Sequence, residues 1–104
     1  MTTTPQTADL PDFDMADYLK TGEDVANYLT LVLQDNDPNE LQYALGTIAR
    51  ARGMSEVALA SGLTREALYK ALRRTSQPRF DTNTKVCAAL GVKLVAVPLQ
   101  SQII

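Results

Sequence analysis

The chain has 104 residues, a formal net charge of −2, 45 % hydrophobic residues and 21 % charged residues, which is typical of one globular domain with a modest core. It contains no apolar run long enough to cross a membrane, so no membrane-spanning helix is predicted. Residues 1–11 contain neither a basic residue nor an apolar block, so we expect no secretory signal. The single cysteine suits a reducing cytosol, so we expect a cytoplasmic protein.

The first elements predicted along the chain are a disordered tail and an amphipathic helix. Residues 1–11 are rich in threonine and contain two prolines, a composition that favours a disordered tail. Residues 13–19 are compatible with one short helical turn. A better helix is predicted at 23–33, where Thr21 can serve as the N-cap and Asp24 completes a capping-box pattern. Its apolar stripe consists of Val25, Tyr28, Leu29 and Val32.

The second predicted helix spans 38–52 and has the clearest start in the chain. Asp37 is the expected N-cap, and Pro38 occupies the first helical position, where its missing N–H would have no helical partner. Gly53 is expected to end the helix as a left-handed cap. Gly46 costs this helix up to about 1 kcal/mol relative to alanine, and a close helix crossing would explain it. The apolar face consists of Leu41, Ala44, Leu45, Ile48 and Ala49.

Two short helices follow, and together they resemble a helix-turn-helix of the phage-repressor type. Ser55 is expected to cap a helix at 56–60, Gly62 to make the tight turn, and Thr64 to cap a helix at 65–73. A small residue on the first helix lets the two helices cross closely, and leucines hold the second helix against the core. These residues are Ala58, Leu63, Leu68 and Leu72.

The C-terminal part is predicted to contain a polar loop, one more helix and a single strand. The loop spans 74–79, and the helix begins near Asp81 and stops at Gly91. Alternating residues between Lys93 and Val97 favour a β-strand. No second strand is predicted to satisfy its backbone groups. We therefore expect the strand to pair with the same strand of a second copy, giving a homodimer, or with the sheet of a partner protein.

These elements predict a mainly α fold: a phage-repressor-like helix-turn-helix bundle of about five helices with one short C-terminal β-strand. The single domain spans 12–99, with an acidic N-terminal helical segment and tails at 1–11 and 100–104. The charge is segregated, since residues 1–45 contain nine acids and one base, whereas residues 46–104 contain nine bases and three acids. Such halves usually face different partners, although chance clustering of solvated charges would give the same pattern.

The outward face of the second helix of the helix-turn-helix is the predicted DNA-reading surface. Arg65 is the expected base reader, because arginine pairs bidentately with guanine, while Tyr69 and Lys70 can reach bases or backbone. Glu66 can accept a hydrogen bond from cytosine, or its charge can simply stabilise the N-terminus of the helix. The complete predicted DNA-binding set is Ser55, Thr64, Arg65, Glu66, Tyr69, Lys70, Arg73, Arg74, Ser76 and Arg79. The alternative is a plain helical bundle whose basic face is merely solvated.

The inventory of reactive side chains argues against catalysis. Cys87 is the single cysteine and histidine is absent, which excludes a disulfide within the chain and a histidine-containing metal site. With no histidine to activate it and apolar neighbours in a helix, Cys87 is expected to be buried filler. The chain also lacks a phosphate-cradling glycine-rich loop and a recognisable catalytic carboxylate pair. We therefore expect no enzyme activity, cofactor or metal.

Five stretches together resemble the addiction-module antidote family, whose members are helix-turn-helix antitoxins. The stretches are 17–19, 35–38, 44–53, 62–72 and 90–94. The resemblance implies an antitoxin that neutralises a toxin of the RelE/ParE superfamily and represses the shared operon by binding double-stranded operator DNA. Because those toxins are usually basic, it also implies that the acidic stretch 9–37 faces the toxin.

Apolar residues of the acidic segment are the candidate toxin anchors, since aromatic and aliphatic side chains dominate interfaces. The predicted anchors are Tyr18, Leu19, Tyr28 and Leu29, with burial in the chain's own core as the alternative. Two other functions stay open: a stand-alone phage-type repressor without a toxin partner, and a protein-interaction module that has kept a helix-turn-helix shape. Loss of salt-dependent DNA affinity would favour the second.

Overall fold

The structure, a computed structural model, describes residues 18–99. Within this range the chain forms five helices, which confirms the prediction of a mainly α fold with about five helices. The helices are α3 (Gly22–Gln34), α4 (Pro38–Arg52), α5 (Met54–Ser61), α6 (Arg65–Ala71) and α7 (Phe80–Ala89). The tails predicted at 1–11 and 100–104, and most of the turn at 13–19, lie outside the described residues.

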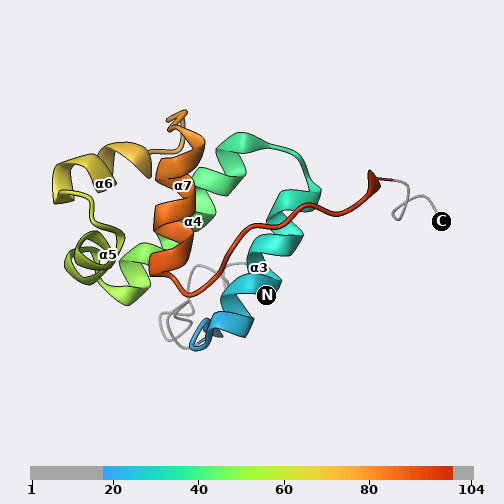
Figure 1. Ribbon diagram of the computed structural model, residues 1–104, viewed down its shortest axis with the longest axis horizontal. Coiled ribbons are helices and arrows are strands. Elements are labelled where there is room, and N and C mark those ends of the chain that lie inside the picture. Colours follow the sequence, from blue (N-terminus) through green and yellow to red (C-terminus); the bar gives the residue numbers. More distant parts are fainter. Residues whose placement is uncertain (1–17, 100–104) are drawn as a thin grey trace, which may run out of the picture.

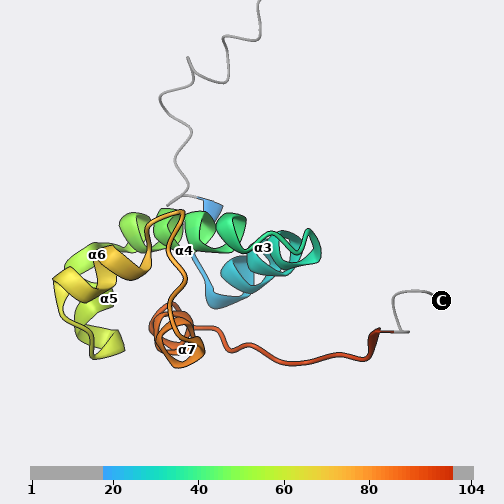
Figure 2. The ribbon, with the colours of Figure 1, turned by 90° about the horizontal axis from the view of Figure 1, so that it is seen from above.

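Helix α4 lies between α3 on one side and α5 and α6 on the other (Figures 1 and 2). It packs against α3 and against α5, and α5 also packs against α6 and α7. Helix α3 therefore lies at one end of the folded body, and α5 and α6 lie at the other end. This arrangement separates the helix that follows the acidic N-terminal part from the helix that carries the predicted basic face.

Three of the predicted helix starts are confirmed by hydrogen bonds. Thr21 and Asp24 form the capping box, in which Thr21 Oγ1 accepts from the Asp24 backbone N–H at 3.1 Å. The Asp37 carboxylate accepts from a backbone N–H in the first turn of α4 at 3.0 Å, and Thr64 Oγ1 does the same for α6 at 3.0 Å. These caps satisfy N–H groups that the first turn of a helix cannot pair internally.

The helix start predicted at Ser55 is wrong. Helix α5 begins at Met54, and Gly53 serves both as the C-cap of α4 and as the N-cap of α5, with no side-chain cap. Gly53 has φ of 109° and ψ of 115°, so it turns the chain within one residue without being the left-handed helical cap predicted. No linker separates the two helices, and Ser55 lies exposed in the first turn of α5.

The hydrophobic core draws side chains from every described helix. Its largest fully buried members are Val25, Leu45, Ile48, Leu68, Val86, Cys87 and Leu90. Cys87 is 1 % exposed, as expected of buried filler, and burial raises the pKa of its thiol, which keeps the thiol protonated near neutral pH. Gly46 is buried as well. A Cβ there would lie 3.4 Å from the Leu72 carbonyl oxygen, which is ordinary van der Waals contact, so this distance does not require a glycine and the suggested close helix crossing is not shown.

Gly91 joins the end of α7 to the C-terminal segment, residues 92–98. Its φ is +89°, and its carbonyl oxygen would lie 3.0 Å from a Cβ at Gly22. We expect Gly91→Ala to lower the free energy of unfolding by about 1 to 2 kcal/mol, because L side chains are strained at positive φ. Gly91→Asn is the control and should cost less, since asparagine tolerates positive φ better. Urea denaturation measures both, and an unchanged midpoint for Gly91→Ala would contradict this account.

The β-strand predicted between Lys93 and Val97 is not formed in the described chain. The C-terminal segment has no regular secondary structure and runs past α3 in Figure 1. Its first residue still donates a backbone hydrogen bond to α7, from Val92 N to the Cys87 carbonyl oxygen at 3.0 Å. A strand forms only by pairing with another strand, and residues 18–99 provide none.

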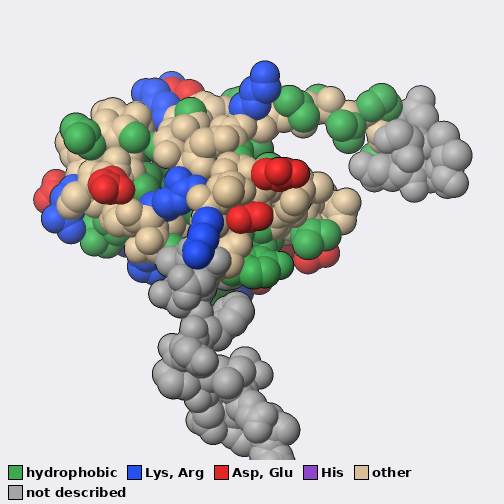
Figure 3. Space-filling model, turned by 90° about the horizontal axis from the view of Figure 1, so that it is seen from below, with side chains coloured by type: hydrophobic (Ala, Val, Ile, Leu, Met, Phe, Trp, Pro, Cys, Tyr) green, Lys and Arg blue, Asp and Glu red, His purple; other side chains and the backbone are tan. Residues whose placement is uncertain are grey.

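The alternation that suggested a strand is nevertheless partly visible in the burial of this segment. Val92 and Leu94 pack against the core, whereas Val95 and Val97 are 74 % and 63 % exposed. Figure 3 shows hydrophobic side chains along the arm that projects from the body of the molecule. The segment therefore turns Val92 and Leu94 toward the core of its own chain and leaves the apolar side chains of Val95 and Val97 in solvent.

Candidate nucleic-acid interface

The turn between α5 and α6 is built around one glycine. Gly62 has φ of +78°, and its N–H donates to the Ala58 carbonyl oxygen at 3.0 Å. The Leu63 N–H donates to the same oxygen at 3.2 Å. Ala58 is buried, as expected for the small residue on the first helix of the pair. Two short helices joined by a glycine turn are therefore present where the sequence predicted them.

Helix α6 is anchored by its buried side and offers the opposite side to solvent. Leu68 is fully buried, and Ala71 and Leu72 are each 6 % exposed. Thr64 fixes the start of the helix through its cap. The exposed side brings together five of the predicted residues on one surface, which we call the α6 face: Arg65, Glu66, Tyr69, Lys70 and Arg73.

The α6 face is positively charged. Arg65, Lys70 and Arg73 lie on it with a single acid, Glu66, and none of these four forms an ion pair within the described residues. Arg65 is oriented by Tyr69, because its Nη2 donates to the Tyr69 hydroxyl at 3.2 Å and its guanidinium carbon lies 5.6 Å from the ring centroid. The tyrosine holds the arginine along the face while most guanidinium donors stay free.

The loop after α6 adds two more predicted residues along one edge of the face. Ser76 and Arg79 line a hollow of about 540 Å³ together with Lys70 and Arg73. Arg79 Nε lies 3.5 Å from Asp81 Oδ1, but both side chains are largely exposed, so this pair is weak. We call this region the loop hollow.

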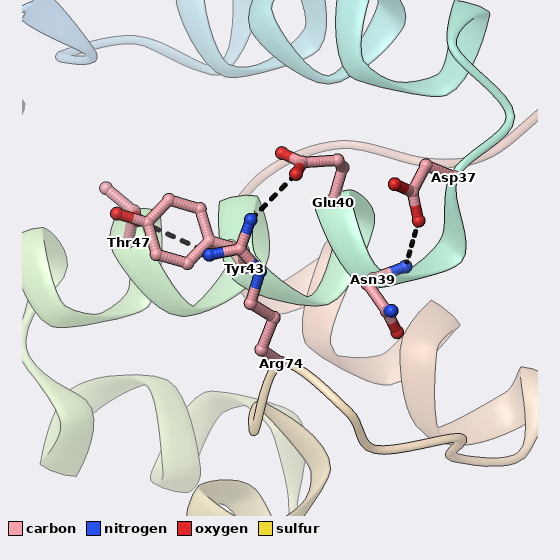
Figure 4. Close-up of polar contacts among 6 residues, drawn as sticks. All are labelled: Asp37, Asn39, Glu40, Tyr43, Thr47 and Arg74. Carbon is pink, nitrogen blue, oxygen red and sulfur yellow. Dashed lines mark hydrogen bonds and ion pairs between the residues drawn. The ribbon is translucent and has the colours of Figure 1, made fainter.

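Arg74 is turned toward α4 (Figure 4). Its Nη2 lies 2.8 Å from Glu40 Oε2, and its guanidinium carbon lies 4.6 Å from the centroid of the Tyr43 ring. The two charged side chains are 54 % and 41 % exposed, so the pair contributes about 0 to 1 kcal/mol. The structure therefore places this predicted phosphate-contacting residue beside α4, away from the loop hollow.

Sequence reasoning missed a buried polar network that fixes the end of α6. Gln42 of α4 is 3 % exposed; its Nε2 donates to the Ala71 carbonyl oxygen at 2.8 Å, and its Oε1 accepts from Asn83 Nδ2 at 3.1 Å. Gln42 thus ties the last turn of α6 to α4 and α7, while Asn83 Oδ1 is buried without a partner. The available signal was a glutamine among the apolar positions of α4, because a buried amide needs partners.

The four predicted toxin anchors divide into two buried and two accessible residues. Leu19 and Leu29 are 2 % and 3 % exposed and belong to the core, which is the alternative left open for them. Tyr18 is 63 % exposed, and Tyr28 is half-buried against the core. The two tyrosines share one groove of about 170 Å³, which we call the α3 groove; it is lined by Tyr18, Asp24, Asn27, Tyr28 and Leu31.

The phenol of Tyr28 is held in its neutral form. Burial, followed by the nearby Tyr43 and Glu40, raises the pKa of the Tyr28 hydroxyl above its usual range. The α3 groove therefore presents two aromatic rings and the neutral Tyr28 hydroxyl, together with the side chain of Asp24. That carboxylate also accepts from the backbone N–H groups of Lys20 and Thr21, which fixes its position.

Among residues 18–99, every helix is too short or too polar to span a lipid bilayer. In the same range, no three histidine, cysteine or acidic side chains come together in a group that could hold a metal ion. The thiol of Cys87 is buried.

Comparison with known proteins gives one family and one relative. The family model described as probable addiction module antidote protein matches residues 9–98. An uncharacterized protein of Haemophilus influenzae is 45 % identical over 87 residues, which cover 84 % of this chain and 90 % of that protein. No solved structure matches, so the likeness to phage repressors is not supported beyond the sequence pattern. The chain belongs to the family of probable addiction module antidote proteins.

Proposed function

We propose that this chain is a cytoplasmic antitoxin that binds and neutralises a RelE/ParE-like toxin and represses its own operon through α5 and α6. The observation that carries the DNA-binding half is the α6 face, where Arg65, Lys70 and Arg73 have no acidic partner within the described residues. Such cations can bind phosphates and base edges. Membership of the antidote family supports the toxin-binding half.

In this proposal α6 enters the major groove of the operator with its N-terminal residues toward the bases. Arg65 pairs with guanine through two N–H donors, and Tyr69 and Lys70 reach neighbouring bases or the backbone. The Thr64 hydroxyl oxygen is used by the helix cap, but its hydrogen is available to a phosphate. Arg79, in the loop hollow, is a further phosphate contact.

Fluorescence anisotropy tests the DNA-binding half, using a labelled duplex from the region upstream of the protein's own reading frame. We expect this duplex to bind more tightly than a shuffled duplex of the same length. We also expect affinity to fall steeply as salt rises from about 50 to about 200 mM, because phosphate contacts release counterions. Equal affinity for both duplexes, or affinity independent of salt, would contradict the proposal.

The α3 groove is the proposed docking site for the toxin. Tyr18 and Leu31 are 63 % and 65 % exposed and line this groove together with a half-buried Tyr28, a set of side chains suited to anchoring an apolar partner residue. The exposed acids Glu23 and Asp35, at the two ends of α3, would steer and orient a basic toxin. A double variant, Tyr18→Ala with Leu31→Ala, is expected to lose toxin binding and keep DNA binding; unchanged toxin binding would place the interface elsewhere.

We also propose that two copies associate through residues 93–97. The backbone groups of these residues have no hydrogen-bond partner within the described chain, and pairing with a second copy would satisfy them and cover Val95. A two-fold dimer would space two α6 helices about 34 Å apart on a palindromic operator. Sedimentation equilibrium is expected to show a dimer for the native chain and a monomer for Val95→Asp. A monomeric native chain would refute the proposed dimer.

A further inference from the structure

A second basic surface lies beside the α6 face, on the side of α4. It is a groove of about 360 Å³, which we call the α4 groove; its lining consists of Tyr43, Arg50, Met54, Tyr69, Leu72, Arg73 and Arg74. Tyr69 and Arg73 also belong to the α6 face, so the two surfaces are continuous. The sequence assigned no functional role to the α4 residues of this groove.

Arg50 lies in the last turn of α4, where a cation is favoured by the helix dipole, and it is the α4 cation of this groove. Its side chain is exposed and forms no hydrogen bond or ion pair with any described residue. Gly46 lies one turn earlier, and a Cβ at that position would lie 3.2 Å from Arg50 Nη1 and 3.4 Å from the Leu72 carbonyl oxygen. The guanidinium therefore lies against α4, next to the end of α6.

The α4 groove has an excess of positive charge. Three guanidinium groups line it, from Arg50, Arg73 and Arg74. Of these, only Arg74 has an acidic partner among the described residues, which is Glu40 at 2.8 Å (Figure 4). The Tyr43 ring lies against Arg74, and Tyr43 also lines the groove. Guanidinium and phenol groups are typical donors to the oxygens of a nucleic-acid backbone.

The α4 groove and the loop hollow both border α6 and share Arg73. Tyr69 marks the edge of α6 that borders the α4 groove, whereas Lys70 marks the edge that borders the loop hollow and Arg79. A helix that lies in the major groove has one phosphate backbone on each side of it. Arg50 and Arg79 lie in different hollows beside α6, so each could meet a different backbone of a duplex that α6 enters.

We propose that Arg50, together with Tyr43, binds the phosphate backbone of double-stranded DNA on the α4 side of α6, and that Glu40 restrains this binding by holding Arg74. The inference rests on the proposed DNA binding by α6 and extends it to a helix outside the helix-turn-helix. Phosphate binding of this kind releases counterions, so it adds affinity without adding sequence preference.

Arg50→Gln tests the proposal, with Arg52→Gln as the matched control on the same helix. Arg52 lies beside Leu19 and Lys20, away from the α4 groove. We expect Arg50→Gln to weaken binding roughly tenfold, equally for upstream and shuffled duplexes. The slope of log affinity against log salt should become about one unit shallower, because one phosphate contact is lost. Arg52→Gln should change neither quantity, and thermal unfolding checks that both variants fold.

Three outcomes separate this inference from the proposed function. If Arg50→Gln behaves like Arg52→Gln while Arg65→Ala loses preference for the upstream duplex, the α4 groove is not a phosphate site and the proposed function stands. If Arg50→Gln alone flattens the salt dependence, the inference is supported. If the native chain shows no salt-dependent DNA binding, both ideas are overturned.

Glu40→Gln tests the restraining role, with Glu23→Gln on α3 as a control that removes the same charge farther from the groove. Releasing Arg74 should raise the affinity for both duplexes several-fold and make the salt slope steeper, since a further cation becomes available to phosphate. Glu23→Gln should have a much smaller effect. Equal effects of the two substitutions would show that only net charge matters and would overturn the role assigned to Glu40.

Discussion

Replacing Leu68 with alanine is expected to lower the free energy of unfolding by about 2 to 5 kcal/mol, the usual range for a fully buried leucine. Leu68 is 0 % exposed and lies at the middle of the buried side of α6. Because a domain of this kind is stable by only about 5 to 15 kcal/mol, one substitution removes a large part of the total. In urea denaturation, Leu68→Ala should lower the midpoint concentration and leave unchanged the slope of unfolding free energy against urea concentration.

Leu59→Ala is the matched control for this prediction. It makes the same change on the neighbouring helix α5, but Leu59 is 84 % exposed, so its effect should stay within about 0.5 kcal/mol. A second variant, Leu68→Met, keeps the side-chain volume and should cost less than about 1.5 kcal/mol. If Leu68→Ala and Leu59→Ala destabilised the chain equally, the assignment of the buried side of α6 would be wrong.

Replacing Arg65 with alanine is expected to remove most of the preference for one base pair of the operator. A bidentate arginine–guanine contact is worth about 1 to 3 kcal/mol of discrimination, which corresponds to roughly 5- to 150-fold in affinity. Arg65 is the first residue of α6, and the Tyr69 hydroxyl orients its guanidinium, so it is placed as a base reader. Competition binding with single-substituted duplexes should locate one position at which Arg65→Ala no longer discriminates.

Lys85→Ala is the control for charge alone. Lys85 is exposed on α7 and has no ion pair among the described residues, so its loss removes the same charge without touching the α6 face. Tyr69→Phe removes only the hydroxyl that accepts from Arg65, and it should weaken discrimination at the same position by less than Arg65→Ala. A loss spread evenly over all base positions would instead assign Arg65 to a phosphate contact.

Signals that act within one helical turn were predicted correctly from the sequence. Thr21, Asp37 and Thr64 are caps because their oxygens accept from N–H groups two or three residues ahead, so a short window of sequence contains both partners. The turn at Gly62 is local in the same sense. The predicted start of α5 was wrong because Gly53 both ends α4 and caps α5. The preference for serine at the N-cap placed the start at Ser55, which is too late.

Contacts between distant parts of the chain could not be predicted from local patterns. Gln42 meets Ala71 and Asn83, and Arg74 meets Glu40, across 29 to 41 residues of sequence. The orientation of α6 and of the α4 groove depends on these contacts. A sequence window could indicate only that Gln42 interrupts an apolar face and that cations cluster after α6.

Burial within an apolar stripe depends on what packs opposite, and sequence periodicity does not supply that information. Leu19 and Leu29 matched the pattern of interface anchors as well as Tyr18 did, yet both are enclosed by the core. Pairing of the residues between Lys93 and Val97 depends on another strand, which the described part of one chain does not contain.

Growth of cells that express the reading frame adjacent to this gene, alone and together with this protein, tests the antitoxin claim most directly. We predict that the neighbour alone stops growth, that co-expression restores it, and that the two proteins purify together. A harmless neighbour, or a toxic one that this protein neither rescues nor binds, would contradict the claim and leave a stand-alone repressor as the better explanation of the α6 face.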